Sequence, residues 1–181
     1  PRLPFTFLDH KIKCGNSLIG TWFDQFMHYP AMAWMREGGD KSHTNGVHFE
    51  KEAWTKAIKA NVADVKKQLV EYIDGRGLVQ QVDLSSIKTV HDQAEKALQD
   101  IHRIGIHEAG QRASRYRDLR ESSDFVNLQF AFDLWCSLWF WPPGQIDDCP
   151  MPMDFYEHKL SDNSKSIVRQ LASERRFFHW E

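Results

Sequence analysis

The sequence is poor in cysteine. Only three occur, Cys14, Cys136 and Cys149, and no two of them form a Cys-x-x-Cys pair. An odd number of widely spaced cysteines argues against a disulfide framework and against a structural zinc site. The sequence also has no recognisable signal peptide. We therefore expect a protein of the reducing cytoplasm.

The chain also lacks an excess of positive charge. Its 23 Lys and Arg residues are balanced by 25 Asp and Glu residues, which gives a net charge of −2. The chain as a whole is therefore not an electrostatic nucleic-acid binder, and any basic surface must be local.

A long uninterrupted hydrophobic run is absent too. The nearest candidate, residues 125–141, is slightly short for a membrane span, contains Asn127, Gln129 and Asp133, and ends at Pro142-Pro143. We expect a buried helix of a soluble domain here, and no membrane partner.

Motifs for nucleophilic, phosphate or metal chemistry are missing. The sequence has no Gly-x-Ser-x-Gly motif and no phosphate loop. His43 and His48 lie in a polar loop. His102 and His107 are five residues apart, a spacing that does not place them on one face of a helix. No metal site is predicted, because no other ligand completes either set.

Apolar residues are plentiful enough to form a core, since 41% of the chain is hydrophobic and 13% aromatic. Apolar residues at spacings of three and four predict a helix from about residue 50 to 73 and a second from Ser85 or Ser86 to about residue 120. These two helices are expected to form an antiparallel hairpin. A third, central helix, apolar nearly all round, is predicted at 123–141, and a last helix at about 161–175, where Ser161 begins a capping sequence. The four prolines at 142–152 are taken to exclude helix there.

The predicted fold class is therefore mainly α, with a long helical hairpin, a central apolar helix and a short β segment at the N-terminus. Strands are expected near 5–8 and 11–14, followed by an exposed glycine-rich loop at 36–46. The predicted domains are residues 1–49 and a helical region at 50–181.

Four stretches, in order, resemble one family. They are LPFTFLDHKIKCGNSLIGTWF (3–23), MAWMREGGDKSHTNGVHFEKEAW (32–54), FDLWCSLWFWPPGQIDDCPMPMDFY (132–156) and FFHWE (177–181). They resemble segments of the large adenine-N6 DNA methyltransferases of restriction-modification and phage-defence systems, including BREX- and DISARM-type methylases. In that family, the first stretch follows the acidic strand that holds the ribose of S-adenosylmethionine, and the last precedes the catalytic Asn-Pro-Pro-aromatic motif.

The chain departs from that family in two motifs. It contains no Asp-Pro-x-x-Gly-x-Gly loop for the methionine end of the cofactor, and no Asn-Pro-Pro-aromatic motif. The second motif is needed to bind the amino group of the flipped adenine and to stack on the base. The resemblance therefore implies a fragment that lies between the cofactor motifs and the catalytic motif of a larger parent, and that is inactive alone.

The resemblance also implies a cofactor contact at Gly15, Asn16, Ser17 and Leu18, near the adenine of S-adenosylmethionine in the parent. The alternative is an ordinary turn at a strand end, for which Gly-Asn-Ser is a common sequence. The fragment itself is expected to bind no cofactor, because most of the pocket is absent.

A basic bias near the end of the second predicted helix makes Arg112 and Arg115 candidate DNA-phosphate contacts, with a solvated helix face as the alternative. Asp133 on the apolar helix needs a partner, and we expect a Ser, Trp or Arg side chain. His28 and His179 are interpreted as surface or packing residues.

The sequence thus predicts a non-catalytic helical segment of an adenine-specific DNA methyltransferase. Its expected partners are DNA through the parent and the remainder of the methyltransferase chain. The alternative is a helical protein-interaction or self-association module with no nucleic-acid role, since exposed apolar residues could drive dimerisation.

Overall fold

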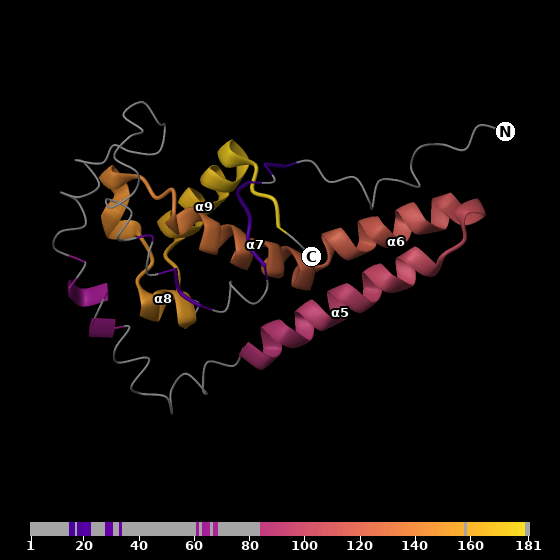
Figure 1. The fold of residues 1–181 in the computed structure, drawn as a ribbon, viewed down its shortest axis with the longest axis horizontal. Coiled ribbons are helices and arrows are strands. Elements are labelled where there is room, and N and C mark those ends of the chain that lie inside the picture. Colours follow the sequence, from indigo (N-terminus) through magenta and orange to yellow (C-terminus); the bar gives the residue numbers. More distant parts are fainter. Residues whose placement is uncertain are drawn as a thin grey trace.

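The computed structural model describes residues 15–16, 18–22, 28–30, 33, 61, 63–65, 67–68, 84–157 and 159–179. This part of the chain is mainly helical, as predicted (Figure 1). Its elements are α5 (Leu84–Arg103), the 3-10 helix η3 (Ile106–Glu108), α6 (Ala109–Glu121), α7 (Ser123–Leu138), the 3-10 helix η4 (Pro143–Asp148), α8 (Pro152–Tyr156) and α9 (Asp162–Arg175). The strands predicted at 5–8 and 11–14, the loop at 36–46 and most of the helix predicted at 50–73 lie outside the described residues.

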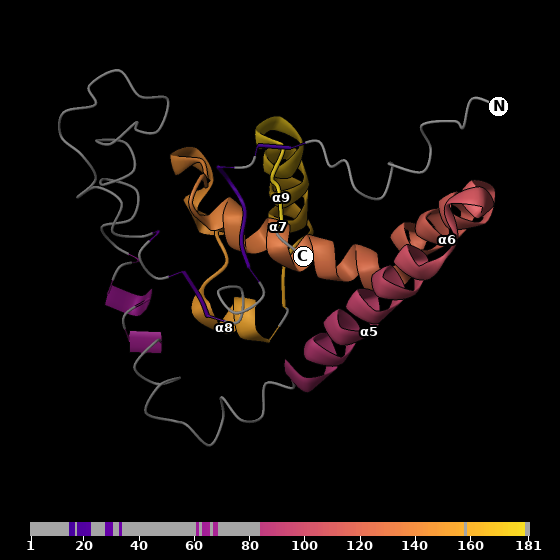
Figure 2. The same cartoon turned by 45° about the vertical axis from the view of Figure 1, so that its right-hand side comes forward.

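The second predicted helix is not one helix, and the sequence-based prediction was wrong on this point. The chain leaves α5 at Ile104 and Gly105, where Gly105 has an extended ψ of 150°, and re-enters a helix at α6. Glycine is a poor helix former, but the apolar stripe continues on both sides of it and therefore resembles one long helix. The observed helical hairpin is formed by α5 and α6, which we call the arm (Figures 1 and 2).

The central helix α7 begins and ends close to the predicted positions. Ser122 adopts an extended conformation that ends α6, and its Oγ accepts a hydrogen bond from Phe125 N–H at 3.3 Å. A serine at this position satisfies one of the free N–H groups of the first turn. α7 packs against α9 on one side and against both helices of the arm.

The proline-rich stretch contains short helices, contrary to the prediction. Pro143 stands in the first turn of η4 and Pro152 in the first turn of α8. Proline is tolerated there because the N–H groups of a first turn have no partner within the helix. The carboxylate of Asp154 accepts a hydrogen bond from Met151 N–H at 3.1 Å, which fixes the start of α8.

The core lies between α7, α8 and α9, and Ala94 of α5 packs into it. We call the region from α7 to α9, together with residues 28–30 and 33 that pack on it, the body. Its core residues include Phe132, Leu138, Trp141, Val168 and Tyr29. Tyr29 donates its hydroxyl to the carbonyl of Pro150 at 2.8 Å, and Trp135 Nε1 donates to the carbonyl of His28 at 2.8 Å. Residues of the first predicted domain, where described, thus share one core with the helical region.

The last helix ends in an unusual conformation. Ser161 caps α9 as predicted, accepting a hydrogen bond from Ser164 N–H at 3.0 Å. At the other end Arg176 is left-handed, with φ 54° and ψ 56°, and is the one non-glycine residue with positive φ among those described. Such a residue ends a helix sharply. It redirects the chain from α9 into the segment 177–179.

Candidate functional site: the paired end segments

Segments from opposite ends of the sequence lie side by side in parallel. Asn16 and Phe177 form an isolated parallel bridge, in which Asn16 N–H donates to the carbonyl of Arg176 at 2.7 Å and Phe178 N–H donates to the carbonyl of Ile19 at 2.8 Å. Both views show the early indigo segment running beside the yellow segment that follows α9 (Figures 1 and 2). We call residues 15–20 and 176–179 the end pair.

Two glycines permit this close approach. A Cβ atom at Gly20 would lie 1.5 Å from the carbonyl oxygen of Phe178, and one at Gly15 would lie 3.0 Å from the Phe178 ring. No side chain fits at Gly20 without displacing backbone. The glycines of the GNSLIG stretch are thus explained by contact with the chain itself.

The predicted cofactor residues form one turn. Asn16 Oδ1 accepts a hydrogen bond from Leu18 N–H at 3.1 Å, and the Asn16 carbonyl accepts one from Ile19 N–H at 2.9 Å. The structure therefore places Gly15, Asn16 and Leu18 together in an Asx-type turn. Ser17 lies outside the described residues. The Leu18 side chain is 93% exposed, so this turn presents an apolar side chain to solvent.

The side chains of Asp133 and His179 join α7 to the end pair. Asp133 Oδ1 and His179 Nε2 are 2.9 Å apart, and the two side chains are only 16% and 8% exposed. The His179 ring also packs near the rings of Phe132 and Phe177, at centroid distances of 5.3 and 6.5 Å. A short, largely buried contact of this kind fixes the position of His179 against α7.

This pairing corrects one sequence-based interpretation and extends another. Asp133 was expected to contact a Ser, Trp or Arg side chain, and its partner is instead His179. His179, predicted to be a surface or packing residue, does pack near Phe132 and Phe177, and it also contacts Asp133. The Ser137 hydroxyl does bond to residue 133, but to its backbone carbonyl, at 2.7 Å. The missed signal was that a carboxylate on an apolar helix needs a polar partner, and that a histidine stands within the apolar FFHW sequence.

The thiol of Cys136, three residues after Asp133 on α7, is buried, and its pKa is raised. Burial, and secondarily the charge of Asp133, raise the pKa of Cys136 to about 12. Cys136 and Cys149 are both buried, and no disulfide joins them. A thiol with so high a pKa is not a nucleophile at neutral pH, so Cys136 is a packing residue.

The two arginines predicted to contact DNA do not share an exposed surface. Arg112 is only 6% exposed, and its guanidinium donates to the carbonyl of Ile104 at the turn between α5 and α6. Arg115 is exposed on α6. Arg112 therefore satisfies a backbone carbonyl beyond the end of α5, while Arg115 alone of the two can reach a partner.

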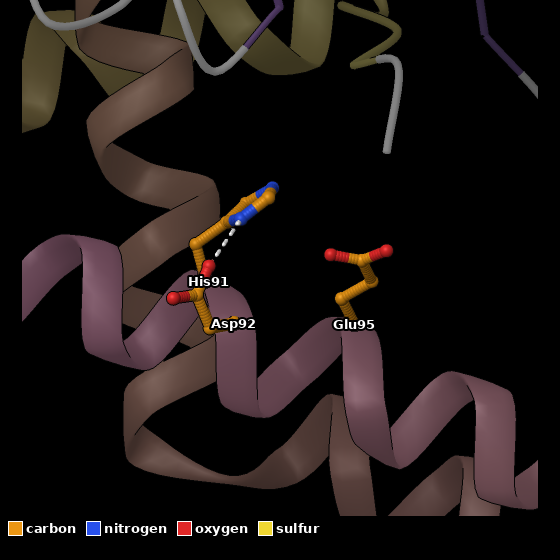
Figure 3. Close-up of side chains that lie close together, drawn as sticks. All are labelled: His91, Asp92 and Glu95. Carbon is orange, nitrogen blue, oxygen red and sulfur yellow. Dashed lines mark ion pairs between the residues drawn. The ribbon is translucent and has the colours of Figure 1, made fainter.

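One group of potential metal ligands lies close together on α5. Figure 3 shows His91, Asp92 and Glu95, whose ligand atoms all lie within 4.8 Å of one another. His91 Nδ1 and Asp92 Oδ1 are 3.7 Å apart. Both carboxylates are exposed, and such groups are common on helices without an ion. This set alone does not define a metal site.

Among the described helices, none has the length and apolarity needed to cross a bilayer. Comparison of the chain with protein-family models, with curated proteins and with solved structures finds no match.

Proposed function

We propose that this chain is the part of an S-adenosylmethionine-dependent adenine-N6 DNA methyltransferase that braces two neighbouring strands of the catalytic domain. The observation that carries the proposal is the end pair, in which Asn16 and Phe177 form a parallel bridge and His179 is held from the side by Asp133. These are the two segments whose sequences resemble the cofactor loop and the stretch before the catalytic motif.

The parallel direction supports this function. Parallel strands need a long crossover connection, and here the crossover contains the whole helical region. Ligands of open α/β sheets bind beyond the carboxyl ends of parallel strands. Because both segments run in one direction, their carboxyl ends face the same edge. A methyl donor held after one segment and a target base held after the other would meet there.

The turn at Gly15–Leu18 fits part of a cofactor site. The exposed Leu18 side chain offers an apolar contact to an adenine ring, and the Asn16 amide NH₂ can donate to the ring edge, since Asn16 Oδ1 is already occupied by Leu18 N–H. Bound S-adenosylmethionine would supply the methyl group. The 181 residues contain no Asn-Pro-Pro-aromatic motif to hold the adenine amino group, so the isolated chain is expected to transfer no methyl group.

The test is methyl transfer by the native polypeptide that carries these residues. This polypeptide is captured with an antibody against the arm and incubated with labelled S-adenosylmethionine and unmethylated duplex DNA. We expect the label in N6-methyladenine after digestion of the product. Label in cytosine, or a native polypeptide that transfers no label, would overturn the proposal.

Bracing itself is tested by Asp133→Ala in the same polypeptide, with Asp118→Ala on α6 as the matched control. Loss of the Asp133–His179 contact is expected to lower the rate of methyl transfer and to speed hydrogen exchange at Phe178 N–H. The control is expected to change neither. Equal rates for both variants would contradict a bracing role while leaving the methyltransferase assignment intact.

Self-association is a second candidate function, favoured by the exposure of Leu18 and of Trp22, which is 53% exposed. Exposed apolar side chains beside an open strand pair are typical of contact surfaces. Sedimentation over a range of concentrations distinguishes the two functions. A dimer that dissociates in the Leu18→Ser/Trp22→Ser variant would support self-association, and a monomer at every concentration would exclude it.

A further inference from the structure

The arm carries a pair of exposed arginines on α6 that the predicted Arg112–Arg115 pair does not include. Arg117 and Arg120 are three residues apart and both are exposed. On an α-helix this spacing puts them about 60° apart, whereas Arg115 points about 160° away from Arg117. Arg117 and Arg120 thus share one face, which we call the basic face.

An aromatic ring lies next to this pair. The Arg120 guanidinium lies over the ring of Tyr116, 6.0 Å from its centroid. Stacking of this kind orders a guanidinium that would otherwise be mobile in solvent. It lowers the entropy that Arg120 would lose on binding an anion.

The two arginines are not neutralised by a carboxylate of the described residues. In the described part of the chain neither forms an ion pair, although Arg103 pairs with Asp100 at 3.0 Å and Lys165 with Asp162 at 3.3 Å. Arg112, in contrast, is buried and committed to the carbonyl of Ile104. The charges of Arg117 and Arg120 are therefore available to an external anion.

From these observations we propose that the basic face of α6 binds the phosphate backbone of duplex DNA. Side chains three apart on a helix start about 5–6 Å from one another, so two guanidinium groups can reach neighbouring phosphates of one strand. The arm projects from the body in both views (Figures 1 and 2). The choice of DNA as the ligand rests on the proposed function, but DNA binding by the arm and methyl transfer by the native polypeptide are measured separately, so that either can fail alone.

The experiment is fluorescence anisotropy of a short labelled duplex of mixed sequence at about 50 mM and about 200 mM salt. We expect the wild-type chain to bind with an affinity that falls steeply with salt. Arg117→Gln/Arg120→Gln is expected to weaken binding about tenfold or more at the lower salt. It should also reduce the slope of log K against log salt by about 2, since two phosphate contacts are lost.

Matched control variants test whether DNA binding depends on the position of Arg117 and Arg120 or only on the total charge of the chain. Lys159→Gln/Lys165→Gln removes two positive charges from the body, and Arg115→Gln removes one from the other side of α6. Both are expected to bind as the wild-type chain does, and circular dichroism checks that each variant keeps its helix content. The inference is overturned if the wild-type chain does not bind, if the control pair weakens binding equally, or if polyglutamate competes as well as DNA does.

Discussion

The body and the arm are both helical, but they are held together by different forces. In the body, α7 buries Leu128, Phe132, Leu134, Cys136, Ser137 and Leu138. In the arm, α6 buries only Ala109 and Arg112. The body is thus stabilised mainly by apolar surface removed from water, whereas the turn of the arm depends on a buried guanidinium.

This difference indicates a division of roles. A densely packed region holds other parts in fixed positions, and the end pair is attached to it through Asp133. A polar hairpin with few buried side chains opens more easily and leaves its charged residues accessible. Substitutions in the two regions are therefore expected to differ in how far they lower the free energy of unfolding and in how much of the chain they loosen.

The largest effect is expected in the core of the body. Trp141 is 1% exposed, and its Nε1 donates to the carbonyl of Gln145 at 2.8 Å. Trp141→Ala removes this contact and leaves a large cavity, so we expect a loss of about 3–5 kcal/mol in the free energy of unfolding, measured by urea denaturation. Trp22→Ala, at a half-exposed tryptophan, is the control and should change it by less than about 0.5 kcal/mol. Similar losses in the two variants would contradict the assignment of the core.

The next effect tests whether the arm is a separate unit. Arg112→Ala leaves the carbonyl of Ile104 without its charged donor, and we expect the arm to lose about 1.5–3 kcal/mol. Hydrogen exchange should become faster in α5 and α6 and remain unchanged in α9. Arg115→Ala, three residues along the same helix, is the control and should leave exchange unaltered. Equal acceleration throughout the chain would mean that arm and body open together.

Arg112→Met sharpens the same test. Methionine fills a similar space without a charge, and replacing a buried charged group with an apolar one of similar size is often neutral. We expect Arg112→Met to destabilise the arm less than Arg112→Ala does. An equal loss in the two variants would indicate that the hydrogen bond to Ile104 matters more than the packing of the side chain.

The two regions also differ in how well the sequence predicted them. The helix at 162–175 was predicted to within one residue, because a Ser cap and an apolar pattern agree there. The helix at 123–138 was predicted with the correct start but three residues too long, because the apolar pattern continues to Trp141. The break at Gly105 was missed, because periodicity continues across it and the turn is held by the buried Arg112, eight residues after Ile104. Burial of an arginine depends on tertiary packing and leaves no local pattern.

The candidate site was predicted only in part for a similar reason. The Gly-Asn-Ser turn was identified, because turn chemistry is local. Its partner, the segment after α9, could not be found by composition or periodicity, since a parallel pairing joins residues from opposite ends of the chain. The Asp133–His179 contact was missed because it depends on that same pairing.

A smaller effect is expected within the end pair, where its two segments approach each other. Gly20→Ala would place a Cβ 1.5 Å from the carbonyl oxygen of Phe178, so the two segments must separate locally. We expect a loss of about 1–3 kcal/mol and faster exchange at Phe178 N–H. Gly144→Ala is the control, since a Cβ there meets nothing within 4 Å. Unchanged exchange in Gly20→Ala would contradict the close approach of the two segments.

The smallest effect concerns Arg176, where the chain turns from the body into the end pair. A left-handed conformation costs a non-glycine residue about 1–2 kcal/mol, and glycine adopts it without this penalty. Because glycine also loses more entropy on folding, we expect Arg176→Gly to stabilise the protein by about 1 kcal/mol or less. Arg175→Gly, one residue earlier and still helical, should instead destabilise it by about 1 kcal/mol. The two arginines are adjacent, and both are replaced by glycine. Changes of opposite sign in the free energy of unfolding, measured by urea denaturation, can therefore arise only from the two backbone conformations and from the stacking of Arg175 on Phe140. Arg175→Ala, which removes the stacking but keeps helix propensity, isolates the backbone part. A loss of stability in Arg176→Gly as large as in Arg175→Gly would show that the turn into the end pair is not left-handed.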